Sequence, residues 1–556
     1  MTLEPFATHE VFNQTTPFVD VNLAALDKPL LGALEAFGDA GAAPSAIAQA
    51  AGLGAAENFE LARLANENPP KLKVFNARGE RQDFVEFHPA YHELMRQSMA
   101  AGLASSTFEG SAALLASGKG KPRGKEHVAR SALHYLMSGI EAGHLCPVTM
   151  THAGVAALAV APTLLKTLMP RVGSRIYDAS FKPFWEKRGV TLGMGMTEKQ
   201  GGSDVRANTT RAEHVAADEY EITGHKWFLS APMCDAFLIL AQAAGGLTCF
   251  LMPRFRPDGT LNALRLQRLK DKAGNRSNAS SEAEFAKAFA WRIGEEGRGV
   301  PTIIEMVRLT RLDCITSSAG LMRMGLALAM HHARHRIAFQ RKLVDQPAMR
   351  ATLADLALSV EAATAVALRL ALAFDRAGED PTESVYARLI TPAIKFAVCK
   401  AAPGFLYEAM ECLGGNGYVE ESPIPRLYRE APVNAIWEGS GNIMALDVLR
   451  AARRDGEGAE RLLAELARET QDLPEAETLV QRVKTGLARR NAEGSARCVT
   501  QALAMLAAAA ALTKCAPPSI AEAFARTRFH GGHSLFGVAD LESECGQLLE
   551  RALPAG

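Results

Sequence analysis

The chain has 556 residues, of which 48% are hydrophobic and 22% charged, the balance of an ordinary soluble protein that is too long for one hydrophobic core. Its 61 basic residues equal its 61 acidic residues, so no overall field attracts nucleic acid or a membrane. The nine cysteines include no CxxC pair, which favours free thiols in a reducing compartment. The first residues show no signal-peptide pattern and the longest apolar run, Ala502–Leu512, is short, so we expect a cytoplasmic protein without a membrane partner.

Helical periodicity dominates the first third of the chain. Small and apolar residues recur every three or four positions in Leu31–Phe37, Ala46–Ala51 and Ala132–Ala142, and the Asn68-Pro69-Pro70 sequence interrupts the pattern. Residues 1–185 are therefore expected to form an N-terminal helical domain.

The pattern changes to that of a β domain between residues 186 and 292. Short runs rich in β-branched or aromatic residues are bounded by Gly, Pro and Asp, as strands joined by tight turns are. These runs are Thr209–Val215, Tyr220–Thr223, Phe237–Ala241 and Leu247–Phe250. We expect a compact middle domain, a β-barrel, built from them.

Long helical periodicity returns in residues 293–450. Ile303–Ala333, Met349–Ala377 and Glu383–Val398 carry broad apolar faces, which suit a helical bundle. Residues 451–556 are also helical but more often broken by proline and glycine, and they predict an extra C-terminal helical domain. The order of the four segments predicts an α+β fold.

One turn places a carboxylate at the start of an apolar helix. In NAIWEGSGNIMALDVLR (434–450), Glu438 follows Trp437 and precedes a Gly-Ser-Gly sequence that lets backbone N–H groups approach a flat or anionic ligand. A base that abstracts a carbon-bound proton needs a fixed position of this kind. The alternative, an acidic residue that the helix dipole alone favours near a helix start, stays open on this motif.

Two further segments are candidates for ligand binding. The loop GMGMTEKQGGSD (193–204) can present backbone N–H groups and hydroxyls to a phosphate, although it has neither GxGxxG spacing nor a P-loop lysine. GHKWFLS (224–230) sets two aromatic rings beside a serine on an expected strand, where a ring can cover a planar cofactor or fill the core. A polar turn and a core strand are the alternatives.

Taken together, these segments resemble the acyl-CoA dehydrogenase superfamily. Segments 196–204 and 224–230 match its flavin loop and flavin strand, and 413–444 matches its closing motif. Segments 269–285 and 294–299 match the stretch before the final strand and the link into the bundle. In the N-terminal helices, LARLANENPP (61–70), HPAYHELM (88–95) and CPVTMT (146–151) resemble the AidB-type branch of alkylation-response flavoproteins.

The resemblance implies FAD, bound non-covalently between the β domain and the bundle, and a homotetramer. The positions that match the family's flavin contacts are Met194, Gly195, Met196, Thr197, Gly202, Ser203, Phe228, Leu229, Ser230, Ile436, Trp437, Gly439, Ser440, Gly441 and Asn442. Phe228 stands where the wider family has a tryptophan.

Glu438 matches the catalytic base of most family members. The implied reaction removes an α-proton from an acyl-CoA thioester at Glu438 while the β-hydrogen leaves as a hydride to the flavin. Another branch carries its base on a bundle helix just before an arginine, where this chain has Thr310 before Arg311, so Glu438 keeps the role. The histidines at 331, 332 and 335 have no acidic or cysteine partner nearby, so no metal site is expected.

Two features of the family's FAD contacts have changed, and the first lies in an element that reaches FAD across subunits. The glycine that follows Phe339 in the family is Gln340 here, in the element that begins at Arg336. Glu411 replaces a glutamine that precedes the double glycine, and a carboxylate near FAD phosphates is repulsive. These contacts therefore need a different geometry in this chain.

The AidB-type resemblance also implies a role in the DNA alkylation response, with double-stranded DNA bound by residues 451–556. That segment has 13 Lys and Arg against 14 Asp and Glu, so binding needs a clustered face. The basic clusters are Arg450, Arg453, Arg454 and, separately, Arg482, Lys484, Arg489, Arg490. Three functions stay open: an AidB-type flavoprotein with weak isovaleryl-type dehydrogenation, a catabolic acyl-CoA dehydrogenase, and a flavin-stabilised DNA-binding protein without turnover.

Overall fold

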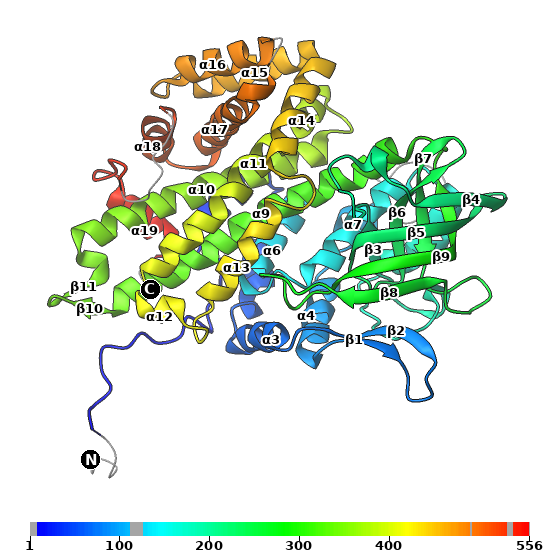
Figure 1. Ribbon diagram of the computed structural model, residues 1–556. Coiled ribbons are helices and arrows are strands. Elements are labelled where there is room, and N and C mark those ends of the chain that lie inside the picture. Colours follow the sequence, from blue (N-terminus) through cyan, green and yellow to red (C-terminus); the bar gives the residue numbers. More distant parts are fainter. Residues whose placement is uncertain (1–7, 112–125, 490–491, 531–537, 555–556) are drawn as a thin grey trace.

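The computed structural model describes residues 8–111, 126–489, 492–530 and 538–554 (Figure 1). Strands β3 to β9 form a β domain on one side of the molecule, and the N-terminal and bundle helices pack beside it. The helices of the last hundred residues lie across one end of the bundle. The predicted α+β class, with a β domain between helical parts, is confirmed.

The N-terminal part is largely helical, as expected. Its α-helices are α1 (Lys28–Phe37), α2 (Ala42–Gln49), α3 (Ala56–Glu67), α4 (Pro89–Ala100), α6 (His127–Ile140), α7 (Leu145–Leu158) and α8 (Pro162–Val172). An antiparallel hairpin, β1 (Lys71–Phe75) with β2 (Arg81–Glu86), departs from the expectation. Strand β1 has no buried side chain, so it lacks the apolar face that would have predicted it.

Seven strands form the β domain. They are β3 (Leu192–Gly195), β4 (Arg211–Ala216), β5 (Glu219–Ser230), β6 (Ala236–Ala243), β7 (Gly246–Pro253), β8 (Leu264–Leu269) and β9 (Ser280–Ile293). The sheet order is β3-β5-β4-β6-β7-β9-β8, and additional β3–β6 and β5–β9 pairings curl the sheet into a barrel-like form. The four predicted strand runs lie within, or within two residues of, β4 to β7. Their β-branched and aromatic residues, bounded by Gly, Pro and Asp, marked them in the sequence.

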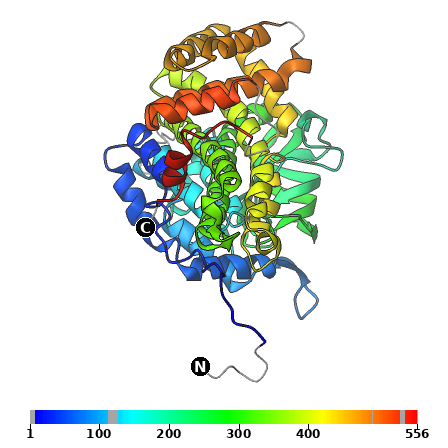
Figure 2. The same ribbon diagram turned by 90° about the vertical axis from the view of Figure 1, so that its left-hand side faces the viewer.

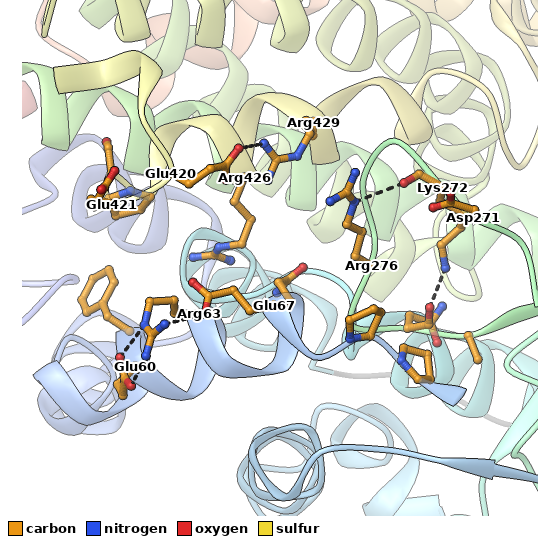
Figure 3. Close-up of a pocket in the computed structure, with 18 of the residues that line it drawn as sticks. Glu60, Arg63, Glu67, Asp271, Lys272, Arg276, Glu420, Glu421, Arg426 and Arg429 are labelled. Atoms are coloured by element: carbon orange, nitrogen blue, oxygen red, sulfur yellow. Dashed lines mark hydrogen bonds and ion pairs between the residues drawn. The ribbon is translucent and has the colours of Figure 1, made fainter. Parts of the chain in front are cut away.

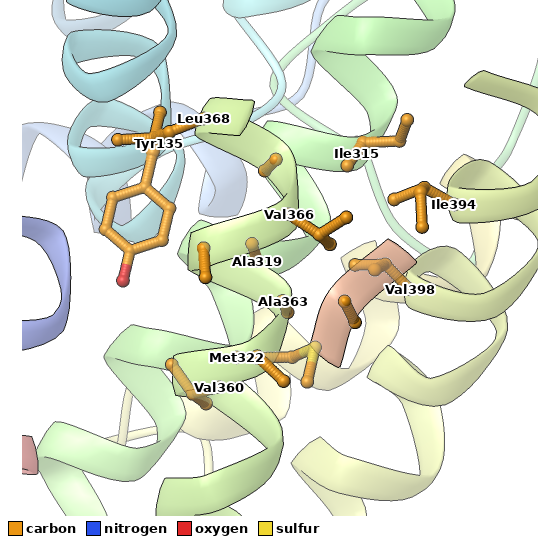
Figure 4. Packing of buried hydrophobic residues seen from close by; sticks show 14 of the residues in the cluster. Tyr135, Ile315, Ala319, Met322, Val360, Ala363, Val366, Leu368, Ile394 and Val398 are labelled. Carbon is orange, nitrogen blue, oxygen red and sulfur yellow. The ribbon is translucent and has the colours of Figure 1, made fainter. Parts of the chain in front are cut away.

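Long helices form the bundle. They are α9 (Gly299–His335), α10 (Pro347–Arg376) and α11 (Pro381–Glu411), followed by the shorter α12 (Gly415–Tyr418), α13 (Ile424–Asn434) and α14 (Gly441–Arg454). Figure 4 shows their common core, where Ile315 and Met322 of α9 face Val366 of α10 and Ile394 of α11. Gly320 allows α9 and α6 to cross closely, because a Cβ there would lie 2.1 Å from the Tyr135 carbonyl oxygen.

The C-terminal helices pack on the bundle. They are α15 (Gly456–Thr470), α16 (Ala476–Ala488), α17 (Ala496–Cys515), α18 (Pro518–Arg528) and α19 (Cys545–Ala552). Figure 2 shows α17 across the end of the bundle, and its apolar residues share one core cluster with α10 and α11. The expected C-terminal helical segment is therefore present and continuous with the bundle core.

Among the described residues, three helices are long and apolar enough, by length and composition, to cross a membrane. They are Pro347–Arg376, Pro381–Glu411 and Glu493–Cys515. Between 67% and 83% of their apolar windows is buried inside the fold, so packing against protein accounts for this composition.

Candidate active site

The turn between α13 and α14 holds Glu438 in a fixed position. Glu438 has a φ of 57° and Gly439 a φ of 103°, so the chain reverses through two left-handed residues. The buried ammonium of Lys395, on α11, donates to the backbone oxygens of Asn434, Trp437 and Gly439, each at 2.9 Å. These three bonds use all donors of the lysine and fix the turn to the bundle.

The carboxyl group of Glu438 faces helix α9. Thr310 donates its hydroxyl to Glu438 Oε2 at 2.7 Å, and Arg311 Nε donates to the Glu438 backbone oxygen at 2.9 Å. Burial raises the pKa of Glu438 above its ordinary value, against the opposing effects of the Thr310 hydrogen bond and the Lys395 and Arg311 charges. A buried carboxylate of raised pKa is a stronger base than an exposed one, as proton abstraction from carbon requires.

Glu438 lines a small cavity between the β domain, the bundle and the N-terminal helices. Its volume is about 50 Å³. Ser230 at the end of β5 and Trp437 line it beside Glu438, so the structure brings together residues from two of the three predicted segments. Cys146 and Thr149 of α7 also line it. They belong to the CPVTMT motif, which indicated the AidB-type resemblance but did not predict that these residues lie at the active site.

The far end of this cavity is polar. Asp313, one helical turn beyond Thr310 on α9, forms a buried ion pair with Arg130 through two bonds of 2.6 and 2.7 Å. Thr149 donates to the same Asp313 at 2.6 Å, and His134 lies 3.3 Å from the Thr149 hydroxyl. The Arg130 and His134 groups hold the pKa of Asp313 far below its ordinary value despite burial, so Asp313 is ionised. Sequence analysis gave no indication of this network, because its members come from three helices.

The predicted flavin loop is braced from within the β domain. Met194 of β3 pairs with Ser230 of β5, and the Trp227 N–H donates to the Thr197 oxygen at 2.9 Å. Below the loop, Glu198 and Lys226 form a fully buried ion pair of 2.7 Å. These contacts join the loop of residues 193–204 to the strand of residues 224–230.

A groove of about 770 Å³ lies on the outer side of the same region (Figure 3). Helix α3 forms one wall, and the start of α13 with the preceding loop forms the other; the β8–β9 connection closes one end. Within the described residues, Lys272, Arg276 and Arg426 in this groove make no ion pair and contact backbone oxygens instead. Asn278 lines the groove and lies near enough to Cys146, which lines the small cavity, to affect the pKa of its thiol, so the two spaces are close neighbours.

Comparisons with known proteins place the chain in a family. Residues 13–179 match the N-terminal domain of the adaptive response protein AidB, and residues 193–288 and 297–452 match the middle and C-terminal domains of acyl-CoA dehydrogenases. The AidB protein of Escherichia coli strain K12 is 46% identical over 526 residues, which cover 93% of this chain and 94% of that protein. The chain belongs to the AidB-type branch of the acyl-CoA dehydrogenase family.

Solved structures agree with this family. The crystal structure of Caenorhabditis elegans ACDH-11 in complex with C11-CoA superposes with a TM-score of 0.82 at 26% identity and covers 93% of both chains. An acyl-CoA dehydrogenase from Bacillus anthracis complexed with FAD shares the fold, with a TM-score of 0.63 at 17% identity over 84% of this chain and 80% of that one. FAD is the cofactor of this family.

The surfaces at the predicted flavin positions suit a planar, phosphate-bearing cofactor. Phe228 is 44% exposed and Ile436 66% exposed, so both offer apolar faces beside the site. Ser440 precedes α14 without a side-chain cap, which leaves backbone N–H groups of that helix as donors. The side chains of Met194 and Leu229 are buried in the barrel, so only their backbone faces a ligand.

The predicted contacts divide between two places. Ser230 and Trp437 line the cavity with Glu438, whereas the loop around Thr197, Gly202 and Ser203 lies outside that cavity. Which of these positions contact FAD remains a prediction.

The β10 (Ile337–Ala338) and β11 (Arg341–Lys342) hairpin carries the position where the family has a glycine. Gln340, at the tip of this hairpin, adopts a φ of 63° without that glycine. The Arg336 side chain donates to the Asn13 backbone oxygen at 2.5 Å.

Proposed function

We propose that the protein is an FAD-dependent acyl-CoA dehydrogenase whose base is Glu438. The observation that carries this proposal is the position of Glu438: it faces a small cavity, its backbone is anchored by Lys395 and Arg311, and burial raises its pKa. FAD, when bound, supplies the hydride acceptor. The chain's own part is to hold the thioester's α-carbon against Glu438 and to exclude water from the proton transfer.

Thr310 and Lys395 would act as positioning residues. Thr310 holds one carboxylate oxygen, so the other, Oε1, is left to receive the α-proton. Lys395 stabilises the strained turn but bonds only to backbone oxygens, so it does not neutralise the carboxylate directly. Proton uptake at Oε1 would leave Glu438 neutral in its buried site, which burial favours.

A Glu438→Gln variant tests the base. It should purify with FAD bound but fail to bleach the oxidised-flavin absorbance during anaerobic titration with butyryl-CoA or isovaleryl-CoA, while the wild type bleaches. The matched control is Glu460→Gln on the exposed face of α15, which should bleach like wild type. Normal bleaching by Glu438→Gln would remove Glu438 from the role.

We further propose that the outer groove binds phosphoryl groups, which both CoA and FAD carry. The support is the presence of three cations that form no close ion pair within the described residues, Lys272, Arg276 and Arg426, although Glu141, Glu420 and Glu430 lie near enough to act on them. Burial lowers the pKa of Lys272 to about 8, and a bound dianion would raise it again. Arg276→Gln should raise the KM for butyryl-CoA or lower FAD occupancy without changing the flavin-bleaching rate at saturation.

The second candidate function is a role in the DNA alkylation response through DNA binding. Its support is family membership and the exposure of Arg450 and Arg454 on α14 and of Arg482 and Lys484 on α16; Arg490 lies outside the described residues. Four phosphate contacts would give a slope of roughly −3.6 in log affinity against log salt. A double-stranded oligonucleotide titrated at several salt concentrations tests this, and no binding at low salt would exclude it.

A homotetramer and a cytoplasmic location are also proposed. The support for self-association is a group of exposed apolar side chains at the β10–β11 hairpin and α12. Phe339 is 92% exposed, Tyr418 80% and Ile337 48%, and exposed apolar side chains that gather in one place are typical of interfaces. The measured mass in solution should therefore be four times the 59.5 kDa of one chain, and Phe339→Glu should reduce it.

A further inference from the structure

The small cavity beside Glu438 is polar where a simple fatty acyl chain would end. Thr310, Asp313 and Ser317 lie on one face of α9, and all three line the cavity. Seven residues of helix rise about 10 Å, so this stripe leads away from Thr310, which holds the Glu438 carboxylate. An acyl chain that follows this stripe therefore meets a carboxylate and a hydroxyl among the apolar side chains of Ala142, Leu145, Met150 and Cys314, which also line the cavity.

Asp313 and Ser317 can each form at least one more hydrogen bond. Asp313 accepts two bonds from Arg130 and one from Thr149, three of the roughly four positions that a carboxylate offers. Among the described residues none hydrogen-bonds to the Ser317 hydroxyl, which is both a donor and an acceptor. A ligand group that donates to Asp313 and pairs with Ser317 would satisfy both.

The charge balance of the cavity excludes charged ligand groups. Arg130 already neutralises Asp313 in a buried, bidentate pair. A carboxylate at the end of the chain would face Asp313, and an ammonium group would lose its hydration next to a pair that is already neutral. A methyl group would displace water from Asp313 and Ser317 without replacing its hydrogen bonds. An uncharged hydroxyl or amide has none of these costs.

The size of the cavity limits the chain. A volume of about 50 Å³ corresponds to roughly four water-sized positions. Roughly four non-hydrogen atoms beyond the reacting carbon therefore fit.

Resting on the proposed dehydrogenation, we propose that the preferred substrate is a short acyl thioester of four or five carbons whose chain ends in an uncharged hydrogen-bonding group. A hydroxyl group is the simplest example. Asp313 and Ser317 are the specificity-determining residues, with Thr149 and Arg130 holding Asp313 in place.

Three thioesters of five carbons test this: pentanoyl-CoA, 5-hydroxypentanoyl-CoA and glutaryl-CoA. The second-order rate of anaerobic flavin bleaching should be about three- to tenfold higher for the hydroxylated ester than for pentanoyl-CoA, the value of one added hydrogen bond. Glutaryl-CoA should be the slowest. An equal or faster rate with pentanoyl-CoA, or the fastest rate with glutaryl-CoA, would overturn the proposal.

Dissociation constants for the same esters, measured by calorimetry on Glu438→Gln, separate this inference from the proposed function. Tighter binding of the hydroxylated ester supports the specificity even if no ester bleaches the wild-type flavin, a result that would refute dehydrogenation alone. Equal binding of the hydroxylated and plain esters would overturn the specificity even if both bleach.

A pair of variants on α9 locates the preference. Ser317→Ala should lower the ratio of the two rates, hydroxylated over plain, because the bond to Ser317 is lost and only the bond to Asp313 remains. Ser318→Ala is the matched control: Ser318 is fully buried and does not line the cavity, so the ratio should match wild type. An unchanged ratio in Ser317→Ala would remove Ser317 from the site.

Discussion

Replacing Thr310 by valine should make Glu438 harder to ionise. The Thr310 hydroxyl donates to Glu438 Oε2 at 2.7 Å, and its other partner among the described residues is the Val307 carbonyl oxygen at 3.0 Å. A hydrogen bond to a charged group contributes about 1.5–3 kcal/mol, and about 1.36 kcal/mol changes a pKa by one unit. We use the lower end of the 1.5–3 kcal/mol range, because the Thr310 hydroxyl can donate to the Val307 oxygen instead when Glu438 is protonated. We expect the pKa of Glu438, already raised by burial, to rise by about one further unit.

The sign of the effect on activity follows from the role of Glu438 as a base. Only the ionised carboxylate accepts the α-proton, so activity is lost as the pH falls through its pKa. In Thr310→Val the acidic limb of the profile should move to higher pH by about one unit, with roughly a tenfold lower rate on that limb. The assay is the single-turnover rate of anaerobic flavin bleaching by saturating butyryl-CoA at a series of pH values.

A matched variant controls for general damage to α9. Thr302→Val lies about two turns away on the same helix, and its hydroxyl bonds within the helix to the Arg298 oxygen at 2.9 Å. It should leave the acidic limb in place. An unshifted limb in Thr310→Val, or the same shift in Thr302→Val, would refute the assignment of Glu438 and Thr310.

Two pairs of variants test stability by denaturant unfolding. Glu198→Ala leaves the buried Lys226 without its partner and should lower the free energy of unfolding by about 3–5 kcal/mol. Glu221→Ala removes a more exposed ion pair and should cost less than about 1 kcal/mol; equal losses would contradict the role of burial. Gly320→Ala, which forces α9 away from α6, should cost about 1–3 kcal/mol. Gly404→Ala sits in open space within α11 and should gain about 0.5–1 kcal/mol; a loss there would refute the steric argument.

Much of the architecture follows from local sequence patterns. Helices α9, α10 and α11 begin within a few residues of the starts predicted for them. The prediction succeeds because a helix that buries a broad face repeats apolar residues at helical spacing. The strands β4 to β7 followed from short alternating runs. The hairpin β1–β2 was missed because its first strand buries no side chain, so no apolar alternation marks it.

The amino-acid sequence by itself determined the order of the domains, the glycine turn that carries Glu438, and the motifs of the family. Only the tertiary structure decided what surrounds that carboxylate. Thr310 reaches it from 128 positions away in the sequence, and the Arg130–Asp313 pair that ends the cavity joins residues 183 positions apart. Such contacts leave no local pattern, because periodicity records which face of an element is buried but not which partner covers it. The buried polar network beside Glu438 is therefore a property of the packing of three helices, and no single segment encodes it.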